Sequence, residues 1–354
     1  MTDNWKTILA FIWGLISATA LFTQDLEDLS FGTDNSLDIA TWNIEWFPKN
    51  GQITVEYVTE IMEQLELDVL AIQEVDNTAM FDQMLDALPA YTGYYESAWF
   101  AGLAYIYKIE SIEINDIYEI YTTSPYWSAF PRSPMVMDMN FMGENYFLIN
   151  NHFKCCGDGI LDFNNESDEE KRRYNAANLL KEYIDTNLSD KNVLVLGDLN
   201  DDIAEAPQNN VFQMIIDDPD NYLFVDFEIA NGSSSNWSYP TWPSHLDHIL
   251  ITNELFDELD NSDIQTIKID EYLDGGWNEY DQNISDHRPV ALKLDFGSSI
   301  NGDVNQDGDV NILDVVSMVN IVLSGKYNNL ADINNDGAVD VLDIVQLVNL
   351  ILNQ

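Results

Sequence analysis

The chain has 354 residues, which predicts about two domains with room for a sizeable hydrophobic core and excludes a miniprotein held together by disulfide bonds. Apolar residues make up 46% of the sequence and aromatic residues 12%, which argues against a wholly disordered chain. Acidic residues number 62 against 14 Lys and Arg, and the formal net charge of −48 excludes nucleic-acid binding through a broad basic surface.

The acidity has two explanations that the sequence leaves open. At about 1 M salt the Debye length falls to about 3 Å, so a protein from a saline habitat would tolerate this charge. An acidic surface would equally keep a secreted protein soluble in ordinary salt.

Residues 1–24 are predicted to be a secretory signal peptide. An apolar run at 8–22 follows Lys6, contains the small residues Ala18 and Ala20, and precedes an acidic stretch. The alternative is a membrane anchor, but the run is shorter than the roughly 20 residues that a bilayer span needs. No second apolar run of that length follows. The mature chain is therefore expected to lack a membrane span and to be secreted by a bacterium, either to the medium or to the cell surface.

Residues 25–296 are predicted to form one α/β domain. Helices are expected at 54–66 and 168–187, where apolar residues recur at helical spacing and acidic residues at 168–170 mark a helix start. Short apolar runs predict strands at 36–44, 68–75, 103–108, 135–139, 146–153, 192–200, 246–252 and 290–296. This mixture indicates a layered α/β sandwich.

Carboxylates, amides and histidines gather at the ends of these predicted strands, where α/β proteins assemble their sites. These residues are Asn43, Glu45, Glu74, His152, Asp198, Asn200, Asp247, Asp286 and His287. A single carboxylate at a strand end is commonly a helix cap. Several carboxylates together with amides and histidines indicate a metallophosphoesterase site.

Six strings carry these residues in a fixed order: TWNIEW, IQEV, NHFK, GDLND, LDHIL and SDHRP. This set resembles the endonuclease/exonuclease/phosphatase superfamily, which includes pancreatic-type deoxyribonucleases, abasic-site nucleases, sphingomyelinases and inositol-polyphosphate 5-phosphatases. The resemblance implies a four-layered α/β sandwich, in which two packed mixed sheets are flanked by helices and the site lies between the tops of the sheets.

The resemblance also implies a role for each of these residues. Glu74 would be the principal metal ligand, with Glu45 and Asp286 completing the metal site. Asp198 and Asn200 would orient the attacking water, and Asp247 would pair with His287. His152 would contact a phosphate oxygen or protonate the leaving group. Asn43 and Arg132 would bind phosphate, the latter matching an arginine of the deoxyribonuclease branch.

The chemistry of phosphodiester hydrolysis requires such a set. Hydroxide and a phosphodiester are both anionic, so a divalent cation held by carboxylates must screen the charge. A histidine that titrates near neutral pH moves the proton, and a carboxylate partner fixes its tautomer. An all-oxygen site with few protein ligands suits Mg²⁺, for which Mn²⁺ could substitute.

Several positions depart from the deoxyribonuclease pattern. Asp76 stands where that branch carries a DNA-binding arginine, and Ala101 or Gly102 replaces the glutamate partner of the acid histidine. His245 and His248 match no family role and are expected to serve packing or hydrogen bonding. The aromatic stretches YTGYYESAWF and NWSYPTWP would either stack bases or pack within loops.

The only two cysteines, Cys155 and Cys156, are adjacent and cannot connect distant segments. A strained vicinal disulfide and two free thiols both remain open.

After a linker at 297–301, residues 302–354 contain a repeat with an offset of 29 residues. Each copy begins with a loop that has oxygen ligands at positions 1, 3, 5, 9 and 12 and a glycine at position 6, which predicts two Ca²⁺ sites. The predicted ligands are Asp303, Asn305, Asp307, Asn311 and Asp314 in the first loop, and Asp332, Asn334, Asp336, Asp340 and Asp343 in the second. A short apolar helix follows each loop.

This pair of loops resembles a type I dockerin, a small α-helical module that docks onto cohesin domains of scaffold proteins. Positions 10 and 11 are often Ser and Thr in cohesin-binding dockerins, but here they are Ile312 with Leu313 and Val341 with Leu342. Apolar pairs suit either a more hydrophobic docking face or internal packing. The alternative to a cohesin partner is a calcium-stabilised cap without one.

The leading functional hypothesis is a secreted divalent-metal-dependent phosphodiesterase, an endonuclease acting on extracellular nucleic acid and docked through the tail. A phospholipid or phosphomonoester hydrolase of the same superfamily is the second hypothesis, favoured by the acidity and by Asp76. A non-catalytic binding module is the third.

Overall fold

A computed structural model describes residues 25–33, 36–97, 100–296, 302–305, 309–324, 327–334 and 336–352. The predicted signal peptide at 1–24 and the linker at 297–301 lie outside the described residues, as does Asp307 of the first calcium loop.

Two six-stranded sheets form the body of the larger domain. Sheet A has the order β11-β12-β1-β2-β4-β3, and sheet B has the order β5-β6-β7-β8-β10-β9. The strands of sheet A are β1 (Ser36–Phe47), β2 (Val69–Val75), β3 (Tyr91–Tyr94), β4 (Gly102–Lys108), β11 (Asp263–Thr266) and β12 (Val290–Asp295). The strands of sheet B are β5 (Glu113–Glu119), β6 (Met135–Phe141), β7 (Glu144–His152), β8 (Asn192–Asp198), β9 (Tyr222–Phe224) and β10 (Asp247–Thr252).

Both sheets are mixed. β1 pairs with β2 in parallel, β7 pairs with β8 in parallel, and the other neighbours are antiparallel. Each parallel pair is joined by a helix, α1 (Gln52–Leu65) in sheet A and α3 (Glu169–Asn187) in sheet B. Parallel strands end at the same edge of a sheet, so the residues that follow β1 and β2, and those that follow β7 and β8, come together.

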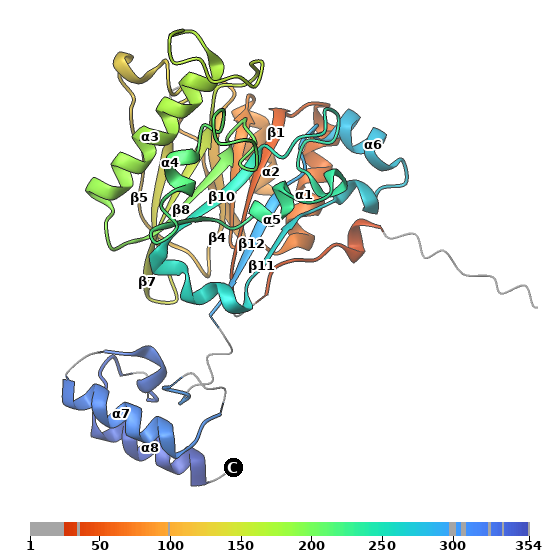
Figure 1. Cartoon of the computed structure of the whole chain (residues 1–354). Coiled ribbons are helices and arrows are strands. Elements are labelled where there is room, and N and C mark those ends of the chain that lie inside the picture. Colours follow the sequence, from red (N-terminus) through yellow and green to blue (C-terminus); the bar gives the residue numbers. More distant parts are fainter. Residues whose placement is uncertain are drawn as a thin grey trace, which may run out of the picture.

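Helices cover the outer faces of both sheets, so the domain has four layers (Figure 1). One apolar core lies between the two sheets, a second lies between sheet A and its helices, and a third lies between sheet B and α3. The remaining helices are α2 (Thr78–Asp86), α4 (Gln213–Ile216), α5 (Phe227–Ala230) and α6 (Gly276–Asn283). The predicted four-layered α/β sandwich is confirmed.

A buried polar bridge links the sheets directly beneath the strand ends. Asn150 Nδ2 on β7 donates hydrogen bonds to the carbonyls of Ile72 and Ala104, both at 3.0 Å. Gln73 Nε2 on β2 donates to Asn150 Oδ1 at 2.8 Å, and the Asn150 backbone N–H donates to the Tyr105 hydroxyl at 2.9 Å. Hydrogen bonds require particular distances and directions, which apolar contacts do not. This bridge therefore fixes the position of one sheet relative to the other.

The tail contains α7 (Ile312–Ser324) and α8 (Val341–Leu352), which pack around a small core of their own that includes Met318 and Leu347. Its helical character agrees with the prediction. Within the part of the chain that the structure describes, no helix has the length and apolarity to cross a membrane.

Candidate active site

Most of the predicted site residues line one cavity of about 390 Å³ at the ends of the central strands. Its lining includes Asn43, Glu45, Glu74, His152, Asp198, Asn200, Asp286 and His287. Asp247 lies directly behind His287, and Arg132 lies 4.0 Å from Glu74, measured from Nη2 to Oε1. The structure therefore brings together residues that are separated by more than 200 positions in the sequence.

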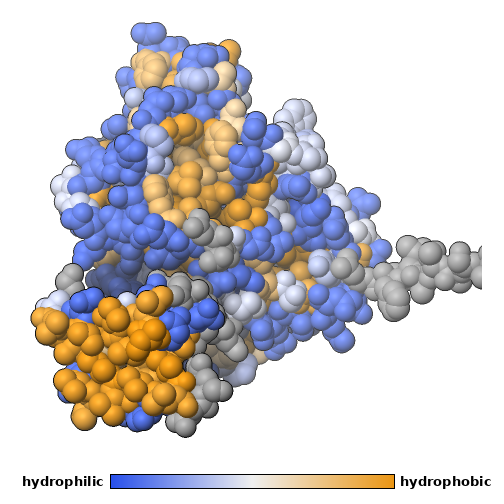
Figure 2. Space-filling model, turned by 60° about the horizontal axis from the view of Figure 1, so that its bottom comes forward, coloured by the Kyte–Doolittle hydropathy of each residue, from blue (hydrophilic) through white to orange (hydrophobic). Residues whose placement is uncertain are grey.

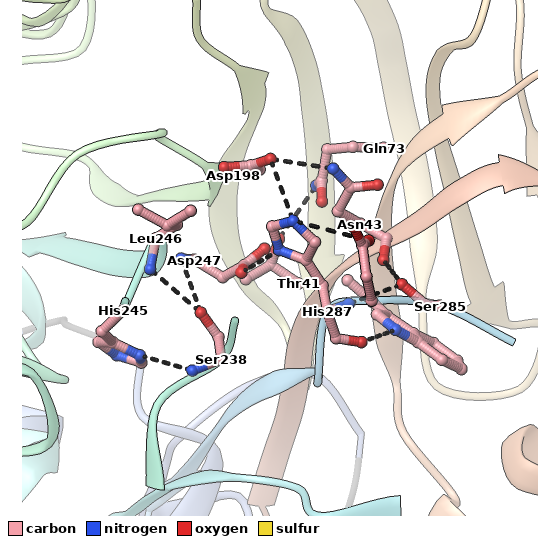
Figure 3. Close-up of polar contacts among 12 residues, drawn as sticks. Thr41, Asn43, Gln73, Asp198, Ser238, His245, Leu246, Asp247, Ser285 and His287 are labelled. Carbon is pink, nitrogen blue, oxygen red and sulfur yellow. Dashed lines mark hydrogen bonds and ion pairs between the residues drawn. The ribbon is translucent and has the colours of Figure 1, made fainter. Parts of the chain in front are cut away.

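His287 and Asp247 form a buried hydrogen-bonded pair. His287 Nδ1 donates to Asp247 Oδ2 at 2.7 Å, which turns Nε2 toward Asp198 Oδ2, 3.9 Å away (Figure 3). Burial by itself would lower the pKa of His287, but the charges of Asp247 and Asp198 outweigh it and raise the pKa to about 10. His287 is therefore held as a proton donor facing the cavity.

Hydrogen bonds also hold the main chain of His287 in place. The indole Nε1 of Trp42 and the hydroxyl of Tyr280 both donate to the His287 carbonyl, at 3.0 and 2.5 Å. The Ser285 hydroxyl donates to the Asn43 carbonyl at 2.6 Å and accepts from the His287 N–H at 2.9 Å. These bonds connect Ser285–His287, the SDH segment, to β1. They therefore set the position of His287 relative to the residues of sheet A.

Three carboxylates, those of Glu45, Glu74 and Asp286, could hold a metal. The Asp286 N–H donates to Glu45 Oε2 at 2.9 Å, and the Trp46 N–H donates to Glu74 Oε2 at 3.1 Å. Glu45 and Glu74 both have positive φ, 43° and 68°, which costs free energy for a non-glycine residue. This unusual backbone turns both side chains into the cavity. Lys49 forms an ion pair with Glu45 from the adjacent loop.

This donor set fits a hard divalent cation. All three groups supply carboxylate oxygen, the ligand that Mg²⁺ and Mn²⁺ prefer, and the three acids share one cavity with Asp198. Burial raises the pKa of Glu45, and the nearby charge of Asp286 raises it further against the opposing effect of Lys49. Like charges gathered in this way are stabilised by a cation between them.

Asp198 sits at the centre of the site. Asn43 Nδ2 donates to Asp198 Oδ2 at 2.9 Å, and the Asn200 N–H donates to Asp198 Oδ1 at 3.1 Å. Burial raises the pKa of Asp198 to about 7, although His287 opposes the shift. A carboxylate that titrates near neutral pH suits a group that takes a proton from water.

His152 projects from the end of β7 toward the same centre. Its Nε2 lies 3.5 Å from Asp198 Oδ2 and 3.8 Å from Glu74 Oε1. Among the described residues, no hydrogen-bond partner reaches its buried Nδ1, which agrees with the absence of a glutamate at Ala101 or Gly102. Burial, reinforced by the charge of Arg132, lowers the pKa of His152 well below its usual range. His152 is therefore a neutral hydrogen-bonding group in this arrangement.

Cys155 and Cys156 are two free, exposed thiols on the loop after β7, with their Sγ atoms 2.8 Å apart.

A second buried cluster consists of Asp226, His245 and His248, and the sequence did not indicate it as a unit because Asp226 lies outside all six strings. His245 Nε2 donates to Asp226 Oδ2 at 3.1 Å, while its Nδ1 accepts the Ser238 N–H at 3.2 Å. His248 donates from Nδ1 to Asp226 Oδ2 at 2.5 Å and from Nε2 to the Asp201 carbonyl at 2.9 Å. Both histidines thus have hydrogen-bonding roles, as predicted.

The Asp226 cluster holds the His287–Asp247 pair in position through Ser238. Burial lowers the pKa of His248, but the Asp226 carboxylate outweighs it, so the pKa of His248 is raised. The cluster fixes Ser238, whose hydroxyl accepts the Asp247 N–H at 3.2 Å (Figure 3). The position of Asp247, and through it that of the His287 ring, depends on this network.

The tail loops show matching internal geometry. Asp314 Oδ1 accepts from the Asn305 N–H at 3.0 Å and Oδ2 accepts from the Asn311 N–H at 2.7 Å. Asp343 accepts from the Asn334 and Asp340 N–H groups at 3.3 and 2.9 Å. The loop closes in the same way in both copies, with the twelfth residue bonded to the third and the ninth.

Residues 40–287 match the Endonuclease/Exonuclease/phosphatase family, and residues 301–352 match the Dockerin type I domain. No curated protein matches the chain.

Similar solved structures cover 73% of the chain. TDP2 from D. rerio, complexed with single strand DNA product, has a TM-score of 0.55 and 15% sequence identity, and the match covers 99% of its chain. The human Nocturnin catalytic domain with bound sulfate anion has a TM-score of 0.52 at 13% identity over 94% of its length. An endonuclease/exonuclease/phosphatase from Bacteroides vulgatus has a TM-score of 0.51 at 15% identity over 98% of its length. At these identities the likeness shows the fold.

The family match covers well over half of the chain and includes all the motifs at the cavity except the last two residues of SDHRP. The chain belongs to the endonuclease/exonuclease/phosphatase family of metal-dependent phosphoester hydrolases, and a type I dockerin domain follows its catalytic domain.

Proposed function

We propose that this protein is a secreted phosphodiesterase, dependent on Mg²⁺ or Mn²⁺, that hydrolyses extracellular nucleic acid as an endonuclease. The observation that carries the proposal is the placement of the His287–Asp247 pair beside Asp198 in a cavity with three further carboxylates. The proposed chain consists of a signal peptide at 1–24, a catalytic domain at 25–296, a linker at 297–301 and a docking domain at 302–354.

The residues divide the chemistry between them. Asp198, positioned by Asn43 and assisted by Asn200, orients the attacking water and accepts its proton. His287 donates hydrogen bonds to a phosphate oxygen and stabilises the negative charge that develops there.

His152 lines the cavity beside Glu74, and Arg132 lies next to Glu74 with its Nη2 4.0 Å from Oε1. Arg132 is held by a 2.8 Å hydrogen bond from its Nε to the Ala101 carbonyl, which leaves its other nitrogens for a phosphate. His152 hydrogen-bonds the phosphate or the leaving oxygen. A divalent ion held by Glu45, Glu74 and Asp286 would supply charge screening and polarise the P–O bonds.

The tail would dock the enzyme onto a cohesin-type scaffold protein at the cell surface. Apolar side chains gather over the surface of the tail (Figure 2). The pairs at positions 10 and 11, Ile312 with Leu313 and Val341 with Leu342, are all exposed, which supports a hydrophobic docking face over internal packing. Two Ca²⁺ ions would hold the loops that carry these helices.

A phospholipid or phosphomonoester hydrolase is the second candidate. The observations that favour it are the net charge of −48 and Asp76 in place of a DNA-binding arginine. TDP2 from D. rerio, which has the same fold, was solved with a single strand DNA product, and this supports nucleic acid as the substrate here.

A substrate panel separates these candidates. The full chain, with calcium saturating the tail, is assayed with single-stranded DNA, duplex DNA, RNA, sphingomyelin and inositol phosphates, each with Mg²⁺ and with Mg²⁺ omitted. We expect nucleic acid to be cleaved with the highest kcat/KM, and omission of Mg²⁺ to abolish cleavage. Preferential hydrolysis of sphingomyelin or inositol phosphates would contradict the nuclease assignment. No hydrolysis of any phosphoester would favour a non-catalytic binding module.

A further inference from the structure

The cavity has an aromatic rim that the hydrolytic chemistry does not use. Trp46, Tyr239 and Trp242 all line it together with the catalytic residues. Trp46 is 50% exposed and Trp242 is 78% exposed, although large aromatic side chains are costly to leave in water. Exposed rings beside a reaction centre are positioned to contact a substrate.

Trp46 is held in place from two directions. Its backbone N–H donates to Glu74 Oε2 at 3.1 Å, and its φ of 51° is an unusual backbone conformation for tryptophan. Phe100 stacks against its ring with the centroids 6.1 Å apart and the planes at 26°. The Trp46 ring is thus a flat surface that is already in place, and its backbone is hydrogen-bonded to Glu74, a predicted metal ligand.

Trp242 is carried by a short hairpin loop that leads into β10 of the other sheet. The backbone groups of Tyr239 and Ser244 exchange two hydrogen bonds, at 3.0 and 3.1 Å, and close the loop Tyr239–Ser244 just before β10. Pro240 and Pro243 stiffen this loop. The Tyr239 ring lies 4.7 Å from the His287 ring, so the hairpin is anchored at the catalytic histidine.

Electrostatics cannot supply most of the affinity for a polyanion here. The chain carries a net charge of −48, and carboxylates surround the cavity. Phosphate contacts, which dominate binding by basic nucleases, would be weak away from the metal and Arg132. Stacking of bases on aromatic rings does not depend on charge, and it requires bases whose faces are free.

We propose that Trp46 and Trp242 are base-stacking platforms for nucleotides next to the scissile phosphate, and that the substrate is single-stranded nucleic acid. The inference rests on the proposed nuclease function and narrows its substrate class. Two platforms, one on β1 and one on the loop before β10, suit two separate bases of one strand. Aromatic rings also bind the cation of a phosphocholine headgroup, but each headgroup has only one cation. Two separate platforms therefore favour a strand with several bases over a phospholipid.

Binding is measured by fluorescence anisotropy of a labelled single-stranded oligothymidylate in the Asp198→Asn background with Mg²⁺, in which cleavage is suppressed and the Tyr239–His287 contact is kept. An abasic oligonucleotide of the same length isolates the contribution of the bases. We expect the abasic strand to bind at least tenfold more weakly, and Trp46→Ala to weaken oligothymidylate binding by roughly tenfold. Trp46→Phe should retain most of the affinity. Phe163→Ala, which removes an exposed phenylalanine outside the cavity, should have no effect.

Three results would overturn the stacking proposal: equal affinity for the abasic strand, full affinity after Trp46→Ala, or Trp46-dependent binding to phosphocholine vesicles in place of oligonucleotide. Base-dependent binding without hydrolysis of any phosphodiester by the parent protein would instead contradict the proposed function and leave the stacking site intact. Cleavage of nucleic acid by the parent protein, combined with equal binding of the abasic strand, would contradict the stacking site and leave the proposed nuclease function intact.

Discussion

Replacing His287 by alanine should reduce kcat for phosphodiester hydrolysis by a factor of about 10² to 10³, the usual cost of removing one hydrogen-bond donor that stabilises charge in the transition state. His287 is buried, its Nδ1 is committed to Asp247, and its carbonyl and N–H are fixed by three side chains. A water molecule in the space left by the ring would supply neither the positive charge of the imidazolium nor its fixed direction. The measurement is single-turnover cleavage at saturating Mg²⁺, with circular dichroism to confirm the fold.

A graded series makes this prediction specific. Asp247→Asn keeps the shape of the pair but removes the charge that holds the imidazolium, so its rate should fall between those of the parent protein and His287→Ala. Asp116→Asn changes an exposed carboxylate on β5, outside the cavity, and should leave the rate unchanged. A His287→Ala protein that is folded and retains more than a tenth of the parent rate would exclude His287 from the reaction.

Calcium should raise the melting temperature of the tail by about 15 °C or more. A ligand at a thousandfold excess over its dissociation constant stabilises the folded state by about 4 kcal/mol, and about 1 kcal/mol shifts the melting of a small domain by roughly 4–8 °C. The tail core is small, and buried Asp314 and Asp343 crowd negative charge at the loops. The measurement is calorimetry of the full chain with calcium and with EDTA.

Two variants test whether the shift comes from the predicted loops. Asp303→Ala combined with Asp332→Ala removes the first ligand of each loop and should abolish the shift. Asp309→Ala should preserve it, because loop position 7 contributes only a backbone carbonyl and Ala338 already occupies that position in the second loop. A tail whose melting ignores calcium would disprove the loop assignment.

Sequence patterns predicted the strands that lie inside the sheets and missed those at the edges. The predicted strand at 290–296 is β12 at Val290–Asp295, because Val290, Leu292 and Leu294 recur at every second position, the spacing of a strand that buries one face fully. β9 and β11 have 3 and 4 residues and were not predicted. Strands this short at or near a sheet edge are specified by their neighbours and not by their own periodicity.

The residues that line the cavity could be picked out from the sequence because their chemistry is concentrated in short motifs at strand ends. The residues that position them could not, since their partners are distant in sequence. Nothing local in Asp226 indicates that it binds His245 and His248, about twenty positions away, or that Ser238 would accept the Asp247 N–H. The aromatic residues of NWSYPTWP are visible in the sequence, but only the fold brings the Tyr239 ring next to the His287 ring.

The central claim is that carboxylates from β1, β2 and the SDH segment hold a divalent ion beside His287. Mn²⁺ binding, followed by the loss of the free-ion electron paramagnetic resonance signal while calcium saturates the tail, tests this without relying on activity. Glu74→Gln should remove Mn²⁺ binding by the catalytic domain, and Asp116→Asn should retain it. Identical Mn²⁺ titrations for Glu74→Gln and the parent protein would contradict the account.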